Sequence, residues 1–146
     1  NRGHYYLVGN HENYDDMSTL RVDRIAHVTV LNERRKPLRE IKGYQQQRTF
    51  NVSQYVKEHI YMFGGESITV TFKAKRSIVN QILDWFDGNV EFTNITADNV
   101  VCRVRVNHDA FKYWALQYMQ SVKVLTPASL VTEVKAAIEE GLHQYS

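Results

Sequence analysis

The chain has 146 residues, of which 43% are hydrophobic and 23% are charged. This composition is too apolar for a disordered chain, the length suits one compact domain or two small ones, and no apolar run is long enough to span a membrane. The net charge of +2 is too small to identify a nucleic-acid-binding protein, and the single cysteine excludes an intrachain disulfide and a cysteine-based metal site.

The first part of the chain predicts two strands and the hairpin loop between them. Residues 4–9 (HYYLVG) and 19–30 (TLRVDRIAHVTV) are typical of strands, and the polar, acidic stretch 10–18 is typical of a loop. The second strand is long, and Arg24 with Ala26 indicates a bend or bulge within it. Because the chain lacks an initiator methionine and enters a strand almost at once, we expect a fragment of a longer protein.

The segment from Arg34 to Arg48 contains six basic residues and one acid, Glu40. Such a patch can steer an anionic partner, and a solvated loop explains it about as well. Residues 53–62 then predict a short helix, with Ser53 as its N-cap. The pair Gly64-Gly65 marks a boundary after this helix.

Beyond the glycines, the hydrophobic pattern predicts the order β-α-β-β-α-β. The predicted elements are a strand at 68–73, a helix at 76–87, strands at 90–95 and 100–106, a helix capped by Asn107, and a strand at 122–125. This order is that of a ferredoxin-like fold, in which two helices cover one face of a four-stranded antiparallel sheet. The other face is expected to be open and to carry Thr69, Thr71, Arg103 and Arg105.

Two apolar helical stripes are assigned to the core. The stripe Phe111, Trp114, Ala115 and Tyr118 has the spacing of a buried helix face. A last helix is predicted to start with Thr126 as N-cap and Pro127 at the first helical position. It is expected to bury Leu130, Val134, Ile138 and Leu142, with Tyr145 on the same line.

No residue pattern supports catalysis, a cofactor or a metal. His4, His11 and Glu12 do not match an established metal-ligand spacing, so an acidic, solvated loop is the better interpretation. There is no glycine-rich phosphate loop and no nucleophile motif. Cys102 alternates with valines, which predicts a small buried side chain rather than a nucleophile. We therefore predict no catalytic residues, no metal, no cofactor and no enzyme activity.

An anion site is the most specific chemistry that the residues suggest. Tyr6 and Arg21 lie on neighbouring predicted strands, and Asp23 and Arg24 follow. Guanidinium groups bind phosphate bidentately, and a tyrosine ring offers a stacking face. Further basic residues that could approach this site are Arg39, Lys42 and Arg48. On these residues alone, an anion site and a solvated, salt-bridged sheet remain equally good interpretations. An RNA-recognition module is disfavoured, because the strand VVCRVRV has no aromatic residue.

Two stretches resemble a known pair of domains. The run HYYLVG, a polar loop and LRVDRI resemble the second half of the WYL domain, with Tyr5 in the place of its tryptophan and Ser18 where many relatives have arginine. The runs WALQY at 114–118 and VKVLTPASL at 122–130 resemble the WCX extension. The resemblance implies a partial Sm-like or SH3-like small β-barrel at 1–50, a linking helix and boundary at 51–66, and a WCX domain at 67–146. The expected fold class is thus α+β.

The resemblance also implies a function. WYL domains are ligand-sensing modules of bacterial helix-turn-helix transcription regulators, so the expected ligand is a nucleotide or single-stranded nucleic acid. The ligand residues would be Tyr6, Arg21 and Arg24, with Asp23 orienting them, while Leu20 and Val22 hold the barrel. The site needs a strand end or bulge near Asp23, because a regular strand places Arg21 and Arg24 on opposite faces.

The expected partners and location follow from the same resemblance. We expect a cytoplasmic homodimer formed through residues 67–146, with no membrane partner. DNA would be bound through a helix-turn-helix domain outside this fragment. The alternative is a structural dimerisation or spacer module without a ligand.

Overall fold

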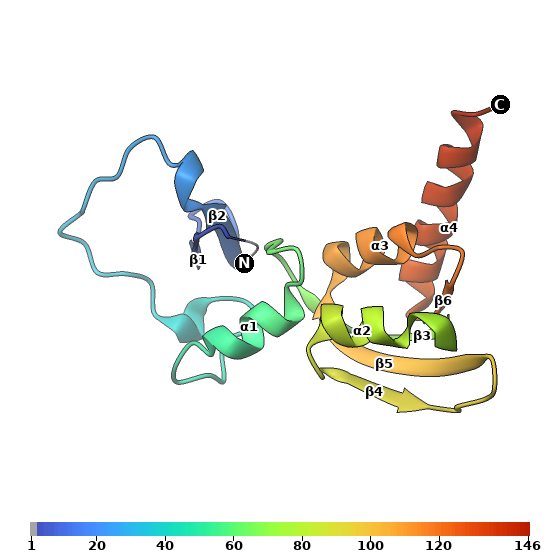
Figure 1. Cartoon of the computed structure of the whole chain (residues 1–146). Helices are drawn as coiled ribbons and strands as arrows, with labels where there is room; N and C mark the ends of the chain where they lie inside the picture. Colours follow the sequence, from blue (N-terminus) through green and yellow to red (C-terminus); the bar gives the residue numbers. More distant parts are fainter. Residues whose placement is uncertain (1–2) are drawn as a thin grey trace.

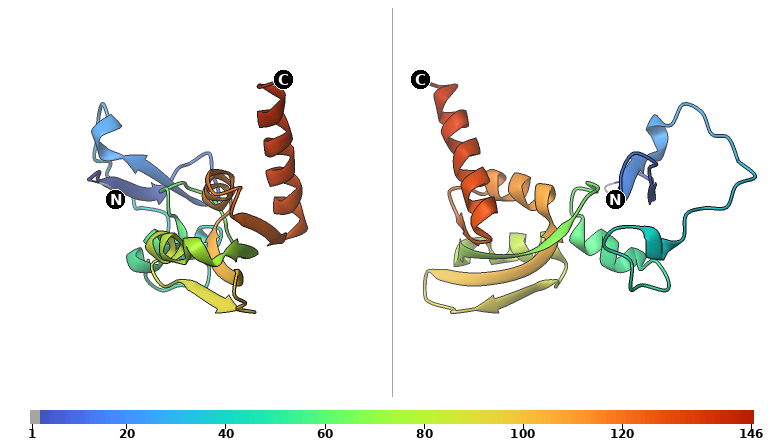
Figure 2. Two further views of the ribbon diagram at one scale, coloured as in Figure 1. Left: turned by 45° about the vertical axis from the view of Figure 1, so that its right-hand side comes forward. Right: turned by 180° about the vertical axis from the view of Figure 1, so that it is seen from behind.

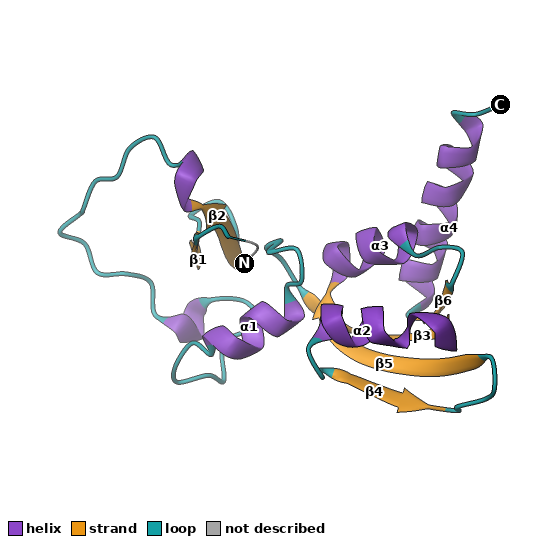
Figure 3. Ribbon diagram, viewed as in Figure 1, coloured by secondary structure: helices purple, strands orange, loops and turns teal. Residues whose placement is uncertain are grey.

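The structure, a computed structural model, describes residues 3–146 and has a mixed α+β fold (Figures 1 and 3). Its strands are β1 (Tyr6–Asn10), β2 (Met17–Arg21), β3 (Ser67–Lys75), β4 (Val90–Thr93), β5 (Asn99–Asn107) and β6 (Val122–Thr126). Its α-helices are α1 (Val52–Glu58), α2 (Val79–Phe86), α3 (His108–Gln117) and α4 (Ala128–His143). Short 3-10 helices lie at Val22–Arg24, Leu38–Glu40 and Arg76–Ile78. We call residues 3–66 the N-terminal region and residues 67–146 the C-terminal region.

The C-terminal region is built on a four-stranded sheet with the order β4-β5-β3-β6, in which every neighbouring pair is antiparallel. The elements follow one another as β-α-β-β-α-β, the order that the hydrophobic pattern predicts. Helices α2 and α3 lie on one side of this sheet (Figure 1). The other face is open and carries the exposed side chains of Thr69, Arg103 and Arg105, as predicted.

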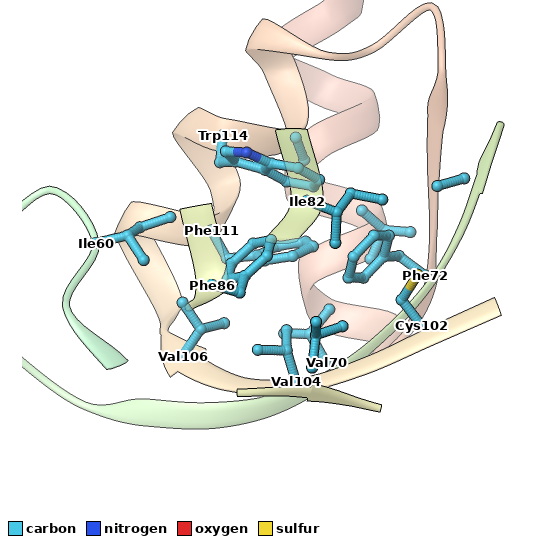
Figure 4. Packing of buried hydrophobic residues seen from close by; sticks show 14 of the residues in the cluster. Ile60, Val70, Phe72, Ile82, Phe86, Cys102, Val104, Val106, Phe111 and Trp114 are labelled. Atoms are coloured by element: carbon cyan, nitrogen blue, oxygen red, sulfur yellow. The ribbon is translucent and has the colours of Figure 1, made fainter. Parts of the chain in front are cut away.

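The main hydrophobic core lies between this sheet and its helices (Figure 4). Alternate residues of the central strands are buried because successive side chains point to opposite faces. Phe72 of β3 is fully buried, and its ring meets the ring of Trp114 on α3 edge-on at 5.3 Å. The assignment of the Phe111–Trp114 stripe to the core is therefore confirmed, as is the burial of Cys102.

Three helix predictions need correction. Helix α1 begins at Val52 instead of Ser53 and ends at Glu58, because the side chain of Asn51 accepts the capping hydrogen bond from the backbone N–H of Gln54 at 3.0 Å. Helix α2 starts only at Val79, after the 3-10 helix Arg76–Ile78. Each correction moves a boundary and leaves the predicted element in place.

Helix α4 also differs from its prediction at both ends. It begins at Ala128, and Pro127 is its N-cap with an extended backbone, instead of Thr126. Leu130 and Val134 are buried as predicted, but Leu142 is 70% exposed. Ile138 and Tyr145 are exposed as well. The reason is that the second half of α4 projects away from the rest of the chain, so nothing packs against its apolar stripe (Figure 2).

The predicted strand at 19–30 is mostly wrong. Strand β2 ends at Arg21, and residues 25–37 contain no helix or strand and arch away from the body of the chain (Figure 1). Isolated extended segments are not stable without a hydrogen-bonded neighbour. The alternating valines of this segment have no such neighbour among residues 3–146, and Val28 and Val30 are exposed.

The face of β2 that packs inward is also the reverse of the prediction. Leu20 is 49% exposed and Val22 is exposed too, so neither holds a core. Met17 is buried, and the hydroxyl of Thr19 lies 2.7 Å from the hydroxyl of Tyr55 on α1. A small second cluster joins these strands to α1 and consists of Met17, Ile41, Tyr55 and Met62.

Gly64 lies between β2 of its own region and Asn107 of the C-terminal region. A Cβ on Gly64 would lie 2.9 Å from the carbonyl oxygen of Met17, so only glycine fits there without movement. The backbone N–H of Gly65 donates to the same oxygen at 3.2 Å. From the other side, the amide Nδ2 of Asn107 donates to the carbonyl of Gly64 at 3.1 Å. Hydrogen bonds thus hold Gly64 and Gly65, the junction of the two regions, against both β2 and Asn107.

Asn107 and His59 hold this junction from opposite regions. The Oδ1 atom of Asn107 caps α3 by accepting from the N–H of Ala110 at 3.0 Å, which confirms the predicted cap. The buried ring of His59 stacks on the ring of Tyr55 and donates from Nδ1 to the Tyr55 carbonyl at 2.8 Å. Within residues 3–146, no helix has the length and apolarity needed to cross a bilayer.

Candidate functional site

Tyr6 and Arg21 lie directly opposite each other on β1 and β2, so their side chains share one face of the two-stranded sheet. The same face packs on the small cluster, and Tyr6 is half-buried against it. Tyr5 points the other way and is exposed. The ladder ends here, because the N–H of Val22 donates to the carbonyl of Tyr5 and the chain then turns into the 3-10 helix Val22–Arg24.

This strand end orients the guanidinium of Arg21. Its Nε donates to one carboxylate oxygen of Asp23 at 3.0 Å, and its Nη2 donates to the other at 2.6 Å. Nη2 also lies 3.2 Å from Nδ1 of His4. The hydrogen bond with Arg21 lowers the pKa of Asp23, and the same bond raises the pKa of Arg21, so both groups stay charged.

The remaining predicted residues are more scattered. Arg24 is exposed at the end of the 3-10 helix, and Arg39 and Arg48 are exposed on the following segment. Lys42 lines a cavity that includes neither Arg39 nor Arg48. The structure therefore brings Tyr6, Arg21 and Asp23 together, places Arg24 within the turn that follows, and does not gather the basic patch into one site.

That cavity, of about 380 Å³, lies where the two regions face each other. Its walls are largely amide and phenol side chains together with three acids and two bases, and they include Asp16, Lys42, Tyr44, Gln45, Gln47, Asn51, Gln54, Tyr55, Glu58, Glu66 and Arg105. Arg105 of β5 and Glu58 of α1 form an ion pair across it at 3.3 Å. Burial raises the pKa of Tyr44 and of Tyr55, so both phenols remain protonated hydrogen-bonding groups.

Sequence reasoning did not find this cavity. Its residues come from a segment without clear periodicity and from a strand about fifty residues later, so only the tertiary fold brings them together. The available signal is the run of amides Gln45-Gln46-Gln47, followed by Asn51 and Gln54. Amides both donate and accept, so the cavity can hold a polar group of either charge.

No metal-binding cluster accompanies these sites in the part of the chain that the structure describes. Within residues 3–146, no three His, Cys, Asp or Glu side chains are close enough to hold a metal ion. Burial raises the pKa of the Cys102 thiol to about 11, so the thiolate is not formed at neutral pH.

Comparison with protein families gives two matches. The family model described as the WCX domain matches residues 65–142, which is more than half of the chain. The model of the WYL domain matches residues 1–30. A search of curated proteins found none that matches. The two matches lie in the same order along the chain as the two stretches noted in the sequence.

Proposed function

Since the chain belongs to the WCX domain family and carries a WYL domain, we propose that it is the ligand-sensing and oligomerisation region of a bacterial helix-turn-helix transcription regulator. WYL and WCX domains are typical of the C-terminal regions of ligand-sensing regulators. The observation that carries the proposal is the presence of both domains in one chain, 1–30 and 65–142. The role is binding rather than catalysis, in the cytoplasm.

The fold supports a finer assignment for each region. The strand order β4-β5-β3-β6 with its β-α-β-β-α-β connections is consistent with a ferredoxin-like fold for the C-terminal region. We assign the hairpin β1–β2, a two-stranded sheet, to part of an Sm-like barrel because the WYL domain model matches residues 1–30. The proposed DNA contact lies in a helix-turn-helix domain outside residues 1–146.

The proposed ligand is anionic, a nucleotide or a short single-stranded nucleic acid, and it binds at Tyr6, Arg21 and Arg24. Asp23 occupies Nε and Nη2 of Arg21 and fixes its guanidinium plane beside Tyr6. A guanidinium fixed in this way loses little conformational freedom when it binds a phosphate. Strand β2 ends at Arg21, so the alternation that would put Arg24 on the opposite face from Arg21 does not extend to Arg24.

A fluorescence-anisotropy titration tests this site. Short single-stranded oligonucleotides and cyclic dinucleotides are titrated into the chain at two salt concentrations, with the variants Arg21→Ala and Arg24→Ala. Loss of a charged hydrogen-bonding partner should weaken binding about 10-fold or more. Arg34→Ala, an exposed arginine in the basic loop, removes the same charge and should have little effect. An equal loss of affinity in Arg21→Ala and Arg34→Ala would show that the ligand responds to the overall positive charge of the chain and not to a specific site.

The proposed oligomer is a homodimer formed through the C-terminal region. The exposed apolar residues at the projecting end of α4, Ile138, Leu142 and Tyr145, support a contact there, because a row of apolar side chains without neighbours is typical of an interface. Ligand binding would shift the dimer equilibrium and so reorient the DNA-binding domains. Light scattering measures the mass of the parent chain and of Leu142→Glu, which should be monomeric. Glu139→Lys changes a charge in the same part of α4 and should leave the dimer intact. A monomeric parent chain would contradict the dimer.

A specific observation favours a second function, a dimerisation or spacer module without a ligand. Arg21 is already bonded to Asp23 and lies close to His4, so the pair can be purely structural. In that case the titration shows no binding to the intact chain, while the mass measurement still shows a dimer.

A further inference from the structure

The open face of the C-terminal sheet carries a line of positive charge that the ligand site of the N-terminal region does not use. Lys73 on β3 and Lys123 on β6 are direct cross-strand partners in the antiparallel ladder. Their neighbours in sequence, Phe72 with Ala74 and Val124, are buried, so both lysines point to the open side. Like charges directly opposite each other destabilise a sheet, so the stability of the sheet does not explain why two lysines are paired here.

The arginines of β5 continue the line. Arg103 pairs with Thr71 and Arg105 pairs with Thr69, so the cations run diagonally from Lys123 through Lys73 to Arg103 and Arg105. Cross-strand partners such as Lys123 and Lys73 are about 5 Å apart, diagonal neighbours such as Lys73 and Arg103 about 7–8 Å, and alternate residues of one strand about 6.7 Å, so the four cations form one row without a gap.

Both arginines of the line form an ion pair with an acid. Glu91 is 3.8 Å from Arg103, and Glu58 is 3.3 Å from Arg105. No acid of residues 3–146 forms an ion pair with Lys73 or Lys123. The two lysines are thus the part of the line whose charge is uncompensated.

A shallow hollow lies on the line between the two arginines. It measures about 210 Å³ and is lined by Thr69, Asn89, Glu91, Arg103, Val104 and Arg105. The hydroxyl and the two guanidinium groups are donors that suit a phosphate oxygen. The hollow is open to solvent, so a continuous chain can pass over it.

From these features we propose that the open face of the C-terminal sheet binds the phosphodiester backbone of single-stranded nucleic acid along Lys123, Lys73, Arg103 and Arg105. A four-stranded sheet is about 15 Å wide, which is narrower than a duplex, and the cations cross it in one line instead of two. No aromatic residue lies on this face of β3, β4, β5 or β6, so bases are not stacked and the binding does not depend on base sequence. This surface goes beyond the proposed function and is separate from Arg21 and Arg24.

The test compares two double variants that remove the same charge. Lys73→Gln/Lys123→Gln neutralises the line, and Lys112→Gln/Lys135→Gln neutralises two lysines of the helices α3 and α4. Labelled oligothymidine, oligoadenosine and a duplex, each of about 15 nucleotides or base pairs, are titrated into the full chain between about 50 mM and about 200 mM salt. The parent chain should bind both single strands with similar affinity and the duplex more weakly.

The expected result has two parts. The variant at 73 and 123 should bind single strands about 10-fold more weakly, and its slope of log affinity against log salt should fall by about 1.4, because each lost phosphate contact in a single strand removes about 0.7. Its melting temperature should be unchanged or higher, since the opposed lysines are gone. The control at 112 and 135 should keep the affinity and slope of the parent chain.

Three outcomes would overturn the proposal: equal losses in the two double variants, tighter binding to the duplex, or a change of oligomeric mass in the 73 and 123 variant without a change in oligonucleotide affinity. The last would assign the face to a protein partner. The variants Arg21→Ala and Arg24→Ala separate this surface from the proposed ligand site. Binding that they abolish and that Lys73→Gln/Lys123→Gln spares belongs to the ligand site, and the reverse pattern belongs to the sheet.

Discussion

The two regions of the molecule differ in the size of the hydrophobic core that holds them together. Eighteen buried residues form the core of the C-terminal region, all but Ile60 from its own strands and helices, whereas only four form the cluster of the N-terminal region. The first core combines a sheet face with amphipathic helices, so local pattern and tertiary packing agree. The second consists of a hairpin, a short helix and long irregular segments. The candidate ligand site therefore lies on the less consolidated part of the chain.

The largest expected effect tests this contrast with one phenylalanine from each region. Phe72 is fully buried among aromatic rings, and Phe72→Ala should lower the free energy of unfolding by about 3–5 kcal/mol. Phe50 is half-buried beside Tyr55, and Phe50→Ala should cost clearly less. Urea denaturation followed by circular dichroism measures both. Equal costs for the two variants would show that the small cluster is as consolidated as the main core.

The junction between the regions gives the next effect. Gly64→Ala places a Cβ 2.9 Å from the carbonyl oxygen of Met17, and because that oxygen belongs to the backbone of β2, the contact can be relieved only if the strand or the backbone around Gly64 moves. We expect a loss of about 1–3 kcal/mol. Gly141→Ala, in helix α4 with open space around it, should be neutral or stabilising by up to about 1 kcal/mol.

Hydrogen exchange localises the change in Gly64→Ala. Faster exchange of β1 and β2, with the amides of β3 and β5 unchanged, is the expected pattern. If protection is lost evenly in both regions, the two regions unfold as one cooperative unit and the contrast between them does not extend to stability.

The helix caps form a third, smaller comparison. Asn51 caps α1 and Asn107 caps α3, each through a 3.0 Å hydrogen bond from the N–H three residues on. Asn51 is exposed and makes only the cap, so Asn51→Ala should cost about 0.5–1 kcal/mol. Asn107 is buried and also donates to Gly64, so Asn107→Ala should cost about 2 kcal/mol. Similar costs in thermal melts would show that the second hydrogen bond of Asn107 contributes little.

These comparisons also explain which features could be predicted from the sequence. Phe72 and Trp114 belong to hydrophobic patterns that can be recognised within a single strand or helix, without knowing which element packs against it. The core and the element order of the C-terminal region can therefore be predicted from the sequence. The sequence also shows Asn107 as a cap because a clear helical stripe follows it. Ser53 was the wrong cap because α1 is short and its single buried side chain, Tyr55, leaves no stripe from which to count.

The candidate sites could be predicted only in part. The sequence shows that an anion site at Arg21 and Arg24 needs a strand end or bulge near Asp23, and β2 does end at Arg21. The sequence does not show which face of β2 is buried. Leu20 is exposed because the opposite face of β2 packs against α1. The pairing of Lys73 with Lys123 depends on the register of two strands separated by most of the region, and periodicity contains no information about register.

The smallest expected effect is a pH dependence at His59, which belongs to the N-terminal region and lies at the junction. The ring is 2% exposed and stacks on Tyr55 with a centroid distance of 3.8 Å. Burial lowers its pKa below the ordinary value, and the nearby carbonyls of Tyr55 and Gly65 offset this shift only in part. Between the two pKa values the unfolded chain holds a proton that the folded chain does not. Stability from this residue is therefore complete above about pH 6.5 and declines as the pH falls through that value toward the folded pKa.

Unfolding by urea at about pH 7.5 and about pH 5.5 measures this decline in stability. The variant His59→Gln should reduce the decline, while His143→Gln, at an exposed histidine, should preserve it. A His59→Gln variant with the full pH dependence would mean that the junction opens enough to solvate the ring, and the small cluster would then be the first part of the molecule to loosen.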